Sequence, residues 1–518
     1  MKKSLFLILP IICLSMSGCG SKGYKYEEVS NKDGSMSYEI FVRSFYDTDG
    51  DGIGDLNGVK AKLPYLYDLG IKTVWLTPIH KSPSYHGYDV RDYYSIHKDF
   101  GTLEDFDNLV TEANKYNIDI MLDMVFNHCS TLNKYFTQSY DDYKSGNTSD
   151  TSKADWFNWE TTKLSGYNQY NDLYYESRFD ASMPDFNLDS VGVRNEIENI
   201  MKFWIVDHKV KAFRLDAVLY YYYQEVDKNI EFLSWLEDTA HKYDPNVYIV
   251  GEAWDDASTI NSYYESKVDS FFRFENANGG GYTSFINLAK GNISASRLEA
   301  IEENEKKIKE NNPKGYSSYF LSNHDQDRVS NNFNEIQSKC AASILCLMPG
   351  TPFMYYGEEI QLKGVRAEGV NTDAPRRLPM IWSKKDKTGE CSFPEKGKEY
   401  TYKGDQVEKG VNDQLKDGYS LVNHYKKVIN IRNKYPFLKE GLFTSLYRQL
   451  DIEEDGVIAY KIASGDQYIN IYHNFSDKTV TFDVIGEKIT DEINTSKKAP
   501  KFKDGKLTLA PYSSAVMQ

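Results

Sequence analysis

Charged and polar side chains stand at the ends of four short apolar segments, where they could perform acid–base chemistry. They are Asp123, Asn127 and His128 in and after IDIMLDM, Arg214 and Asp216 in AFRLDA, Glu252 after VYIVG, and His324 and Asp325 after YFLSN. A carboxylate at the end of a buried strand costs free energy unless it is paired or functional. One such residue more often belongs to a structural ion pair or a helix cap. Four segments that end this way, with two histidines and one arginine, indicate a shared functional site.

Three of these carboxylates meet the requirements of glycoside cleavage. A retaining glycosidase needs a nucleophilic carboxylate and a second carboxyl close by as general acid and base. Arg214 and Asp216 are two residues apart on one predicted strand, so both point to the same side, where the permanent charge of Arg214 would keep Asp216 ionised. Glu252 follows an apolar strand, and partial burial would raise its pKa toward that of a working acid. Asp325 could hydrogen-bond sugar hydroxyls and favour a distorted ring near the transition state.

The elements that must position these residues follow an alternating pattern. From residue 36, short apolar runs alternate with longer amphipathic stretches, which is typical of a parallel sheet in an α/β protein. Eight such runs predict a closed (β/α)8 TIM barrel, whose chemistry lies where strands end and loops begin. The predicted strands are Tyr38–Phe45, Thr73–Thr77, Ile118–Met124, Ala212–Asp216, Val247–Gly251, Ser270–Phe274, Tyr319–Ser322 and Phe353–Tyr356.

Two further regions depart from the barrel pattern. Residues 129–190, between the third and fourth strands, are rich in Tyr, Asn, Asp and Ser and too long for a simple loop, so we expect an inserted domain B. After about residue 440 the apolar pattern changes to a period of two, which predicts a C-terminal antiparallel β-domain. The predicted boundaries are 36–128 and 191–440 for the barrel, 129–190 for domain B and 441–518 for the β-domain.

Composition excludes several classes of protein. The 518 residues include 61 Lys and Arg against 76 Asp and Glu, and a formal net charge of −15 argues against nucleic acid as a partner. With 40% hydrophobic and 14% aromatic residues, the chain can bury a large core. Tyr, at 41 residues, outnumbers Gly, at 34; such a surplus of amphipathic rings fits a sugar ligand, although Tyr also fills cores.

The first 19 residues read as a bacterial lipoprotein signal peptide. Lys2 and Lys3 precede a short apolar run from Leu5 to Leu14, and Met16-Ser17-Gly18-Cys19 resembles a lipobox, in which the chain is cut before a lipidated Cys19. The alternative is an ordinary signal peptide with a chance Cys. Residues 20–35 would form a polar tether, and the protein would be held at the cell surface by the lipid. We expect a monomer, and buried thiols without a disulfide at the four later cysteines, Cys129, Cys340, Cys346 and Cys391.

Five ordered motifs resemble the α-amylase family, glycoside hydrolase family 13. DMVFNH (123–128), FRLDAV (213–218), GEAW (251–254) and LSNHD (321–325) look like the four signature regions of the family, and MPDFN (183–187) resembles the fifth, in a form similar to that of members between the neopullulanases and the oligo-1,6-glucosidases. The resemblance covers roughly residues 36–518.

The resemblance implies roles for the matching residues. Asp216 would be the nucleophile, Glu252 the acid/base and Asp325 the transition-state stabiliser, while Arg214, His128 and His324 would complete the sugar subsite at the cleaved bond. His86-Gly87-Tyr88 resembles the segment whose Tyr stacks on that sugar; the alternative for Tyr88 is a core aromatic. Asp89, beside it, would contact a hydroxyl.

An acidic loop after the first strand predicts a calcium site. Carboxylates recur at alternate positions and glycines permit a tight turn, as a hard cation requires; the candidate ligands are Asp47, Asp49, Asp51, Asp55 and the carbonyl of Ile53. The loop resembles both the start of an EF-hand and a calcium loop of many family-13 enzymes, and the second fits better because the downstream Glu of an EF-hand is missing. The alternative is a solvated acidic turn without Ca²⁺.

The residues after the predicted nucleophile give conflicting indications of substrate preference. Ala217, after the nucleophile, looks more like members active on α-1,4 links, but Leu219 and Tyr220 replace the Lys-His pair of many α-amylases, and the run Tyr220–Tyr223 could stack on sugar or pack a helix. We expect a retaining hydrolase of α-1,4 links in starch or maltodextrins. The alternatives are an α-glucosidase or 4-α-glucanotransferase of the same fold, and a non-catalytic surface starch-binding protein.

Overall fold

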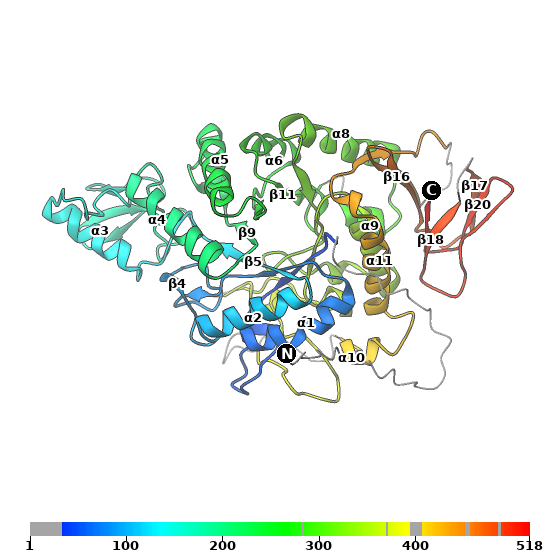
Figure 1. The fold of residues 1–518 in the computed structure, drawn as a ribbon, viewed down its shortest axis with the longest axis horizontal. Coiled ribbons are helices and arrows are strands. Elements are labelled where there is room, and N and C mark those ends of the chain that lie inside the picture. The colour runs from blue at the N-terminus through cyan, green and yellow to red at the C-terminus, as the bar shows by residue number, and fades with distance from the viewer. Residues whose placement is uncertain (1–33, 282–283, 369–370, 394–406, 451–455, 485–487) are drawn as a thin grey trace, which may run out of the picture.

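The protein is built around a closed barrel of eight parallel strands (Figure 1). The computed structural model describes residues 34–281, 284–368, 371–393, 407–450, 456–484 and 488–518, so residues 1–19, Cys19 and most of the predicted tether lie outside the described residues. The strand order is β12-β11-β10-β9-β5-β2-β1-β13, and a parallel bridge from Phe320 to Phe353 closes the ring. The predicted TIM barrel is therefore confirmed.

The barrel strands follow the predicted order closely. They are β1 (Ser37–Ile40), β2 (Thr73–Leu76), β5 (Asp119–Met124), β9 (Ala212–Leu215), β10 (Tyr248–Gly251), β11 (Ser270–Phe272), β12 (Tyr316–Ser318) and β13 (Phe353–Tyr355). The first strand ends at Ile40 because Val42–Ser44 form a 3-10 turn. The seventh begins at Tyr316 instead of Tyr319: its serines are buried, and Ser318 Oγ donates a hydrogen bond to Ser270 Oγ at 2.8 Å. Polar residues thus form a strand that a search for apolar runs misses.

Helices lie around the barrel, and their buried apolar residues share one continuous core with its strands. They are α1 (Leu56–Leu69), α2 (Leu103–Lys115), α4 (Val191–Lys202), α5 (Val226–Tyr243), α6 (Ala257–Tyr263), α7 (Phe285–Ala289), α8 (Ala295–Asn311), α9 (Glu335–Leu347), α10 (Val411–Gln414) and α11 (Leu421–Lys434). Capping boxes begin α2 at Thr102 and α9 at Asn334, which satisfies backbone N–H groups that a helix start leaves open. The buried face of α4 consists of Val193, Ile197, Ile200 and Met201, and the π-helical turn after it buries Trp204 fully.

The inserted region after β5 forms a small domain beside the barrel. It contains α3 (Lys134–Ser145) and an antiparallel sheet of β6 (Trp159–Glu160), β8 (Leu173–Glu176) and β7 (Tyr167–Tyr170). Phe136 lies at the centre of its core, with ring centroids of Phe157, Trp159, Tyr170 and Tyr175 at 5.2, 5.1, 4.9 and 4.9 Å. Part of the tyrosine surplus therefore packs the core of domain B. A short hairpin of β3 (His80–Lys81) and β4 (Asp92–Ile96) lies ahead of it in the chain.

The C-terminal region is antiparallel, as expected. One sheet has the order β14-β15-β16-β21-β18 and a second the order β17-β20-β19. The strands are β14 (Leu442–Ser445), β15 (Val457–Ser464), β16 (Gln467–Asn474), β17 (Val480–Asp483), β18 (Ile489–Asn494), β19 (Lys501–Lys503), β20 (Lys506–Leu509) and β21 (Ser513–Met517). Across the described ranges, no helix has the length and apolar character needed to cross a membrane. The four later cysteines are buried free thiols.

Candidate active site

The structure brings the strand-end carboxylates together around one guanidinium. Asp123 lies in β5, Arg214 in β9, Asp216 directly after β9 and Glu252 directly after β10, so all occupy the carboxyl-terminal end of the barrel. Arg214 Nη1 lies 2.7 Å from Asp123 Oδ1 and 2.6 Å from Asp216 Oδ1, while its Nη2 lies 2.8 Å from Glu252 Oε1. With Arg214 only 1% exposed, a buried cation holds these three carboxylates in fixed positions.

Glu252 has the electrostatic environment of a general acid. Burial raises the pKa of Glu252 to about 7, with Arg214 opposing that rise and the charge of Asp216 adding to it. Its Oε2 accepts a hydrogen bond from the backbone N–H of Ala217 at 3.0 Å. Ala217 has a left-handed backbone, with φ of 50° and ψ of 42°. The turn after the predicted nucleophile is therefore a strained conformation that orients the second carboxyl.

His324 and Asp325 form a second, tightly paired cluster beside the first. His324 Nε2 lies 3.0 Å from Asp325 Oδ2 and 2.5 Å from Tyr88 Oη, and its Nδ1 lies 2.6 Å from Glu39 Oε1. Burial would lower the pKa of His324, but the carboxylates of Asp325 and Glu39 outweigh it and raise the pKa to about 10. An imidazolium donates from both nitrogens, which matches the two carboxylates that flank the ring.

Asp325 is held ionised by two cations. Its Oδ1 lies 2.7 Å from Arg377 Nη2. Burial would raise the pKa of Asp325, but His324 and then Arg377 hold it far below the usual range. Because the side chain is still 28% exposed, an ionised Asp325 can accept hydrogen bonds from a ligand.

Tyr88 joins the two clusters, whereas Asp89 faces its own loop. The Tyr88 hydroxyl donates to Asp123 Oδ2 at 3.0 Å, and its ring is stacked on the His324 ring at 5.5 Å. Asp89 is 4% exposed, and its Oδ1 accepts hydrogen bonds from the hydroxyls of Ser82, at 2.6 Å, and Ser84. Tyr88 thus belongs to the site itself, while Asp89 shapes the loop that carries Tyr88.

Domain B fixes the position of His128. Asp185, in the MPDFN segment, accepts a hydrogen bond from Asn127 Nδ2 at 3.0 Å, and its backbone pairs with that of His128. His128 is 2% exposed, and its Nε2 is buried without a hydrogen-bond partner among the described residues. An unpaired buried imidazole nitrogen is costly, and a substrate hydroxyl would satisfy it.

Sequence reasoning missed two charged residues of this cluster. Glu39 lies in β1 and Arg377 in the segment after β13, and both are buried, with exposed fractions of 2%. The signal for Glu39 is a carboxylate inside the apolar run SYEIFV, within the predicted strand instead of at its end. Arg377 lies in an irregular segment, so nothing in its local sequence places it beside Asp325.

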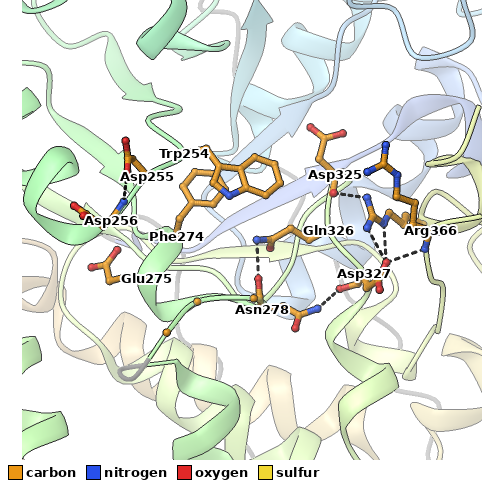
Figure 2. Close-up of a pocket in the computed structure, with 14 residues that line it drawn as sticks. Trp254, Asp255, Asp256, Phe274, Glu275, Asn278, Asp325, Gln326, Asp327 and Arg366 are labelled. Carbon is orange, nitrogen blue, oxygen red and sulfur yellow. Dashed lines mark hydrogen bonds and ion pairs between the residues drawn. The ribbon is translucent and has the colours of Figure 1, made fainter. Parts of the chain in front are cut away.

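A cavity of about 680 Å³ opens beside Asp325 (Figure 2). It is lined by Trp254 and Phe274 and by polar residues that follow β12. The Trp254 ring stacks on Phe274 with centroids 4.8 Å apart, yet Trp254 is 49% exposed. Since Trp254 follows Glu252 by two residues, a broad aromatic face borders the carboxylates.

A second aromatic surface borders the site from domain B. Phe179 lies 5.3 Å from the His128 ring and 4.5 Å from the Tyr220 ring, and Tyr223 stacks on Tyr220 at 5.9 Å. Phe179 and Tyr223 are 46% and 44% exposed. The Phe179 ring is therefore available to a ligand, whereas the Arg178 guanidinium lies over the Tyr223 ring at 4.4 Å.

The acidic loop after β1 gathers carboxylates as a cation site would. Oxygens of Asp47, Asp49 and Asp55 lie within 4.8 Å of one another. Asp51 is outside this group: its Oδ1 accepts the backbone N–H of Ile53 at 2.7 Å. Asp47 accepts three backbone N–H groups of the loop, from Asp49, Gly50 and Gly52, which holds the turn closed. The oxygen-only donor set fits Ca²⁺.

A closed (β/α)8 barrel with a domain after the third strand and a carboxylate cluster at its carboxyl-terminal end defines a class of glycoside hydrolases. Residues 39–441 match the α-amylase catalytic domain, and residues 457–516 match the C-terminal domain of the α-amylase SusG. The chain therefore belongs to the α-amylase family, and the predicted enzyme class is confirmed.

Relatives and solved structures agree with this assignment. α-Amylase 3 of Dictyoglomus thermophilum is 36% identical, with 93% of each chain covered. An oligo-1,6-glucosidase of Parageobacillus thermoglucosidasius is 30% identical over 86% of this chain and 91% of its own. The structure of Eubacterium rectale Amy13B has a TM-score of 0.86 at 35% identity and covers 94% of this chain and 96% of that one.

Proposed function

We propose that this enzyme hydrolyses α-1,4-glucosidic bonds of starch or maltodextrins with retention of configuration. Asp216 attacks the anomeric carbon, Glu252 protonates the leaving oxygen and then activates water, and Asp325 binds hydroxyls of the distorted ring. The observation that carries the proposal is that Arg214 binds both Asp216 and Glu252, while burial raises the pKa of Glu252 to about 7. A retaining mechanism requires a nucleophilic carboxylate and a second carboxyl close by that acts as acid and base.

The surrounding residues supply contacts for the sugar. His128 Nε2 has an open hydrogen-bonding position, and Arg214, His324 and Tyr88 fix the carboxylates around the sugar to be cleaved. Trp254 on one side and Phe179 on the other offer exposed aromatic rings to further glucose units. Such platforms substitute for the Lys-His pair that Leu219 and Tyr220 replace.

An α-glucosidase or 4-α-glucanotransferase is the second candidate. It is favoured by relatives named oligo-1,6-glucosidase and maltase, of which the first is 30% identical. Ala217 favours the α-1,4 assignment. Chromatography of products from maltoheptaose, pullulan and isomaltose separates the alternatives: shorter maltodextrins from maltoheptaose support hydrolysis of α-1,4 links. Products longer than the substrate support a transferase, and rapid cleavage of isomaltose supports an α-1,6-glucosidase.

We further propose that the loop of Asp47, Asp49, Asp51, Ile53 and Asp55 binds a structural Ca²⁺. Three clustered carboxylates repel one another without a cation, and Asp55 also caps α1 by accepting Gly58 N–H. Bound Ca²⁺ would stabilise the start of that helix. Prolonged treatment with a chelator should lower the melting temperature, and Ca²⁺ but not Mg²⁺ should restore it. An unchanged melting temperature would count against the site.

We also propose that the protein is a monomer attached to the outer cell surface by a lipid on Cys19. The proposal rests on the apolar run and lipobox-like Met16–Cys19 of the sequence. Metabolic labelling with a fatty-acid analogue in the native host should label the wild type and not Cys19→Ala. Equal labelling of both, or secretion of the wild type into the medium without lipid, would exclude the anchor. Light scattering of the chain that starts at residue 20 tests the monomer.

A further inference from the structure

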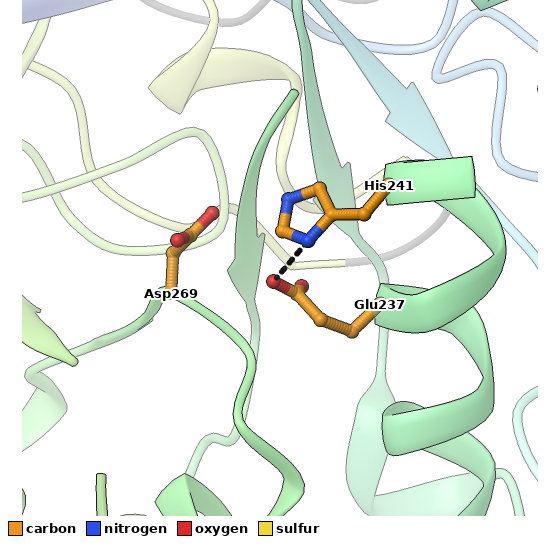
Figure 3. A group of neighbouring side chains, drawn as sticks. All are labelled: Glu237, His241 and Asp269. Carbon is orange, nitrogen blue, oxygen red and sulfur yellow. Dashed lines mark ion pairs between the residues drawn. The ribbon is translucent and has the colours of Figure 1, made fainter. Parts of the chain in front are cut away.

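A second cluster of metal-ligating side chains lies at the end of the barrel opposite the active site. Glu237 and His241 are four residues apart on α5, and Asp269 directly precedes β11, so the cluster lies where strands begin (Figure 3). One ligand atom from each of the three lies within 4.8 Å of the others. The catalytic proposal uses none of these residues.

The distance between Glu237 and His241 is informative. His241 Nδ1 lies 3.4 Å from Glu237 Oε1, which is long for a charge-assisted hydrogen bond of about 2.7–2.9 Å. Ligands bound to Zn²⁺ at about 2.1 Å in a tetrahedron are separated by about 3.4 Å. The pair is thus spaced as two ligands of one ion.

The second nitrogen of His241 is already oriented as in a metal site. His241 Nε2 lies 3.0 Å from the backbone oxygen of Val247, which can only accept, so Nε2 donates in this bond and Nδ1 is the nitrogen that faces Glu237. A histidine that ligates a metal usually donates its other N–H to such a carbonyl. Asp269 is fixed in the same manner, because its Oδ2 accepts Ile249 N–H at 2.9 Å, which leaves Oδ1 for a ligand.

The buried carboxyl group of Glu237 is not fully paired by the surrounding protein. Glu237 is 5% exposed, and its Oε2 is buried without a hydrogen-bond partner within the described ranges. An unpaired buried carboxyl is costly, and a bound cation would offset that cost.

From this geometry we infer that Glu237, His241 and Asp269 form a binding site for a transition-metal cation of the Zn²⁺ type. One imidazole and two carboxylates suit Zn²⁺, whereas Ca²⁺ requires six or more oxygens. His241 lies in the last turn of α5, where the helix dipole favours a cation. His241 is 33% exposed, so water can complete the coordination shell.

Calorimetric titration of the chelator-treated full chain with Zn²⁺, in excess Ca²⁺, tests the site. We expect one Zn²⁺ per chain at this site and a higher melting temperature in its presence. His241→Gln and Glu237→Gln should each weaken binding by more than about 100-fold, since even the loss of an outer partner costs 10–100-fold. The matched control is His208→Gln, because His208 pairs with a single carboxylate, Asp107, at 2.6 Å.

The titration gives different results if the Zn²⁺ site exists and if it does not. Zn²⁺ binding that is lost in both α5 variants and kept in His208→Gln supports the site. Absence of Zn²⁺ binding to the wild type, or binding that persists in both variants, overturns it. If one variant fails to fold, Asp269→Asn replaces it with the same expectation. In excess Ca²⁺, starch hydrolysis by the Zn²⁺-free wild type and by His241→Gln should agree within about twofold, because the cluster lies at the opposite end of the strands.

Discussion

Replacing Glu39 with Gln should bring the titration of His324 into the neutral range. The carboxylate of Glu39 lies 2.6 Å from His324 Nδ1, and both side chains are buried. Two unit charges about 4 Å apart at an effective dielectric constant of 20 attract by about 4 kcal/mol, which corresponds to about 3 pKa units. The pKa of His324, raised to about 10 in the wild type, should therefore fall to about 7 in Glu39→Gln.

Carbon-13 NMR of histidine-labelled protein measures this pKa directly. The chain has nine histidines, and the signal that disappears in His324→Gln identifies His324. In the wild type this signal should not titrate between pH 5 and about 8.5, and in Glu39→Gln it should titrate near 7. Asp107→Asn, which alters the exposed partner of His208, is the control and should leave the His324 signal unchanged. A wild-type signal that titrates near 6.5 would refute the reasoning.

The raised pKa of His324 also makes the free energy of unfolding depend on pH in a defined direction. The folded-state pKa of His324, about 10, lies above its unfolded value of about 6.5. The stabilisation from its charge is therefore complete below about pH 6.5 and lost as pH rises through about 10. The destabilisation caused by Glu39→Gln should be largest at about pH 6 and smaller by about 3 kcal/mol at about pH 9. A destabilisation that does not change with pH would show that His324 is neutral.

Further expectations concern three other residues of the site. Because Glu252 must be protonated to act as an acid and its pKa is raised to about 7, kcat/KM should fall as pH rises through about 7; a profile flat to pH 9 would contradict its role. Ala217→Val places a β-branched residue at φ of 50° and should destabilise by about 1–2 kcal/mol in chemical unfolding, whereas Ala217→Gly should not. Arg377→Met removes one partner of a buried ion pair and should destabilise by about 3–5 kcal/mol, with Arg377→Lys retaining part of this; equal stability of all three proteins would exclude the pair.

The sequence predicts the barrel because its strands are apolar and its helices amphipathic. It also predicts that Arg214, Asp216 and Glu252 meet, because residues at the ends of neighbouring parallel strands share one edge. It does not predict the seventh strand correctly, because Tyr316–Ser318 buries serines that pair with other polar groups. Local patterns carry no such long-range pairing.

Long-range contacts also explain which parts of the site escaped sequence reasoning. Glu39 and Arg377 act on His324 and Asp325 from distant segments, at sequence separations of 285 and 52 residues. The aromatic run after Ala217 indicates two alternatives, and only the structure shows that Tyr220 lies against Phe179 of domain B and that Tyr223 stacks on Tyr220. Contacts of this kind depend on how segments far apart in the sequence come together in the fold, which local patterns do not encode.

The most direct test of the proposed mechanism is the anomer and size of products released from maltoheptaose by the wild type and by Asp216→Asn, below pH 7. The account predicts shorter α-anomeric maltodextrins from the wild type, and a rate for Asp216→Asn lower by at least about 10⁴-fold. Cleavage by Asp216→Asn at the wild-type rate, or β-anomeric first products from the wild type, would contradict a retaining mechanism at Asp216.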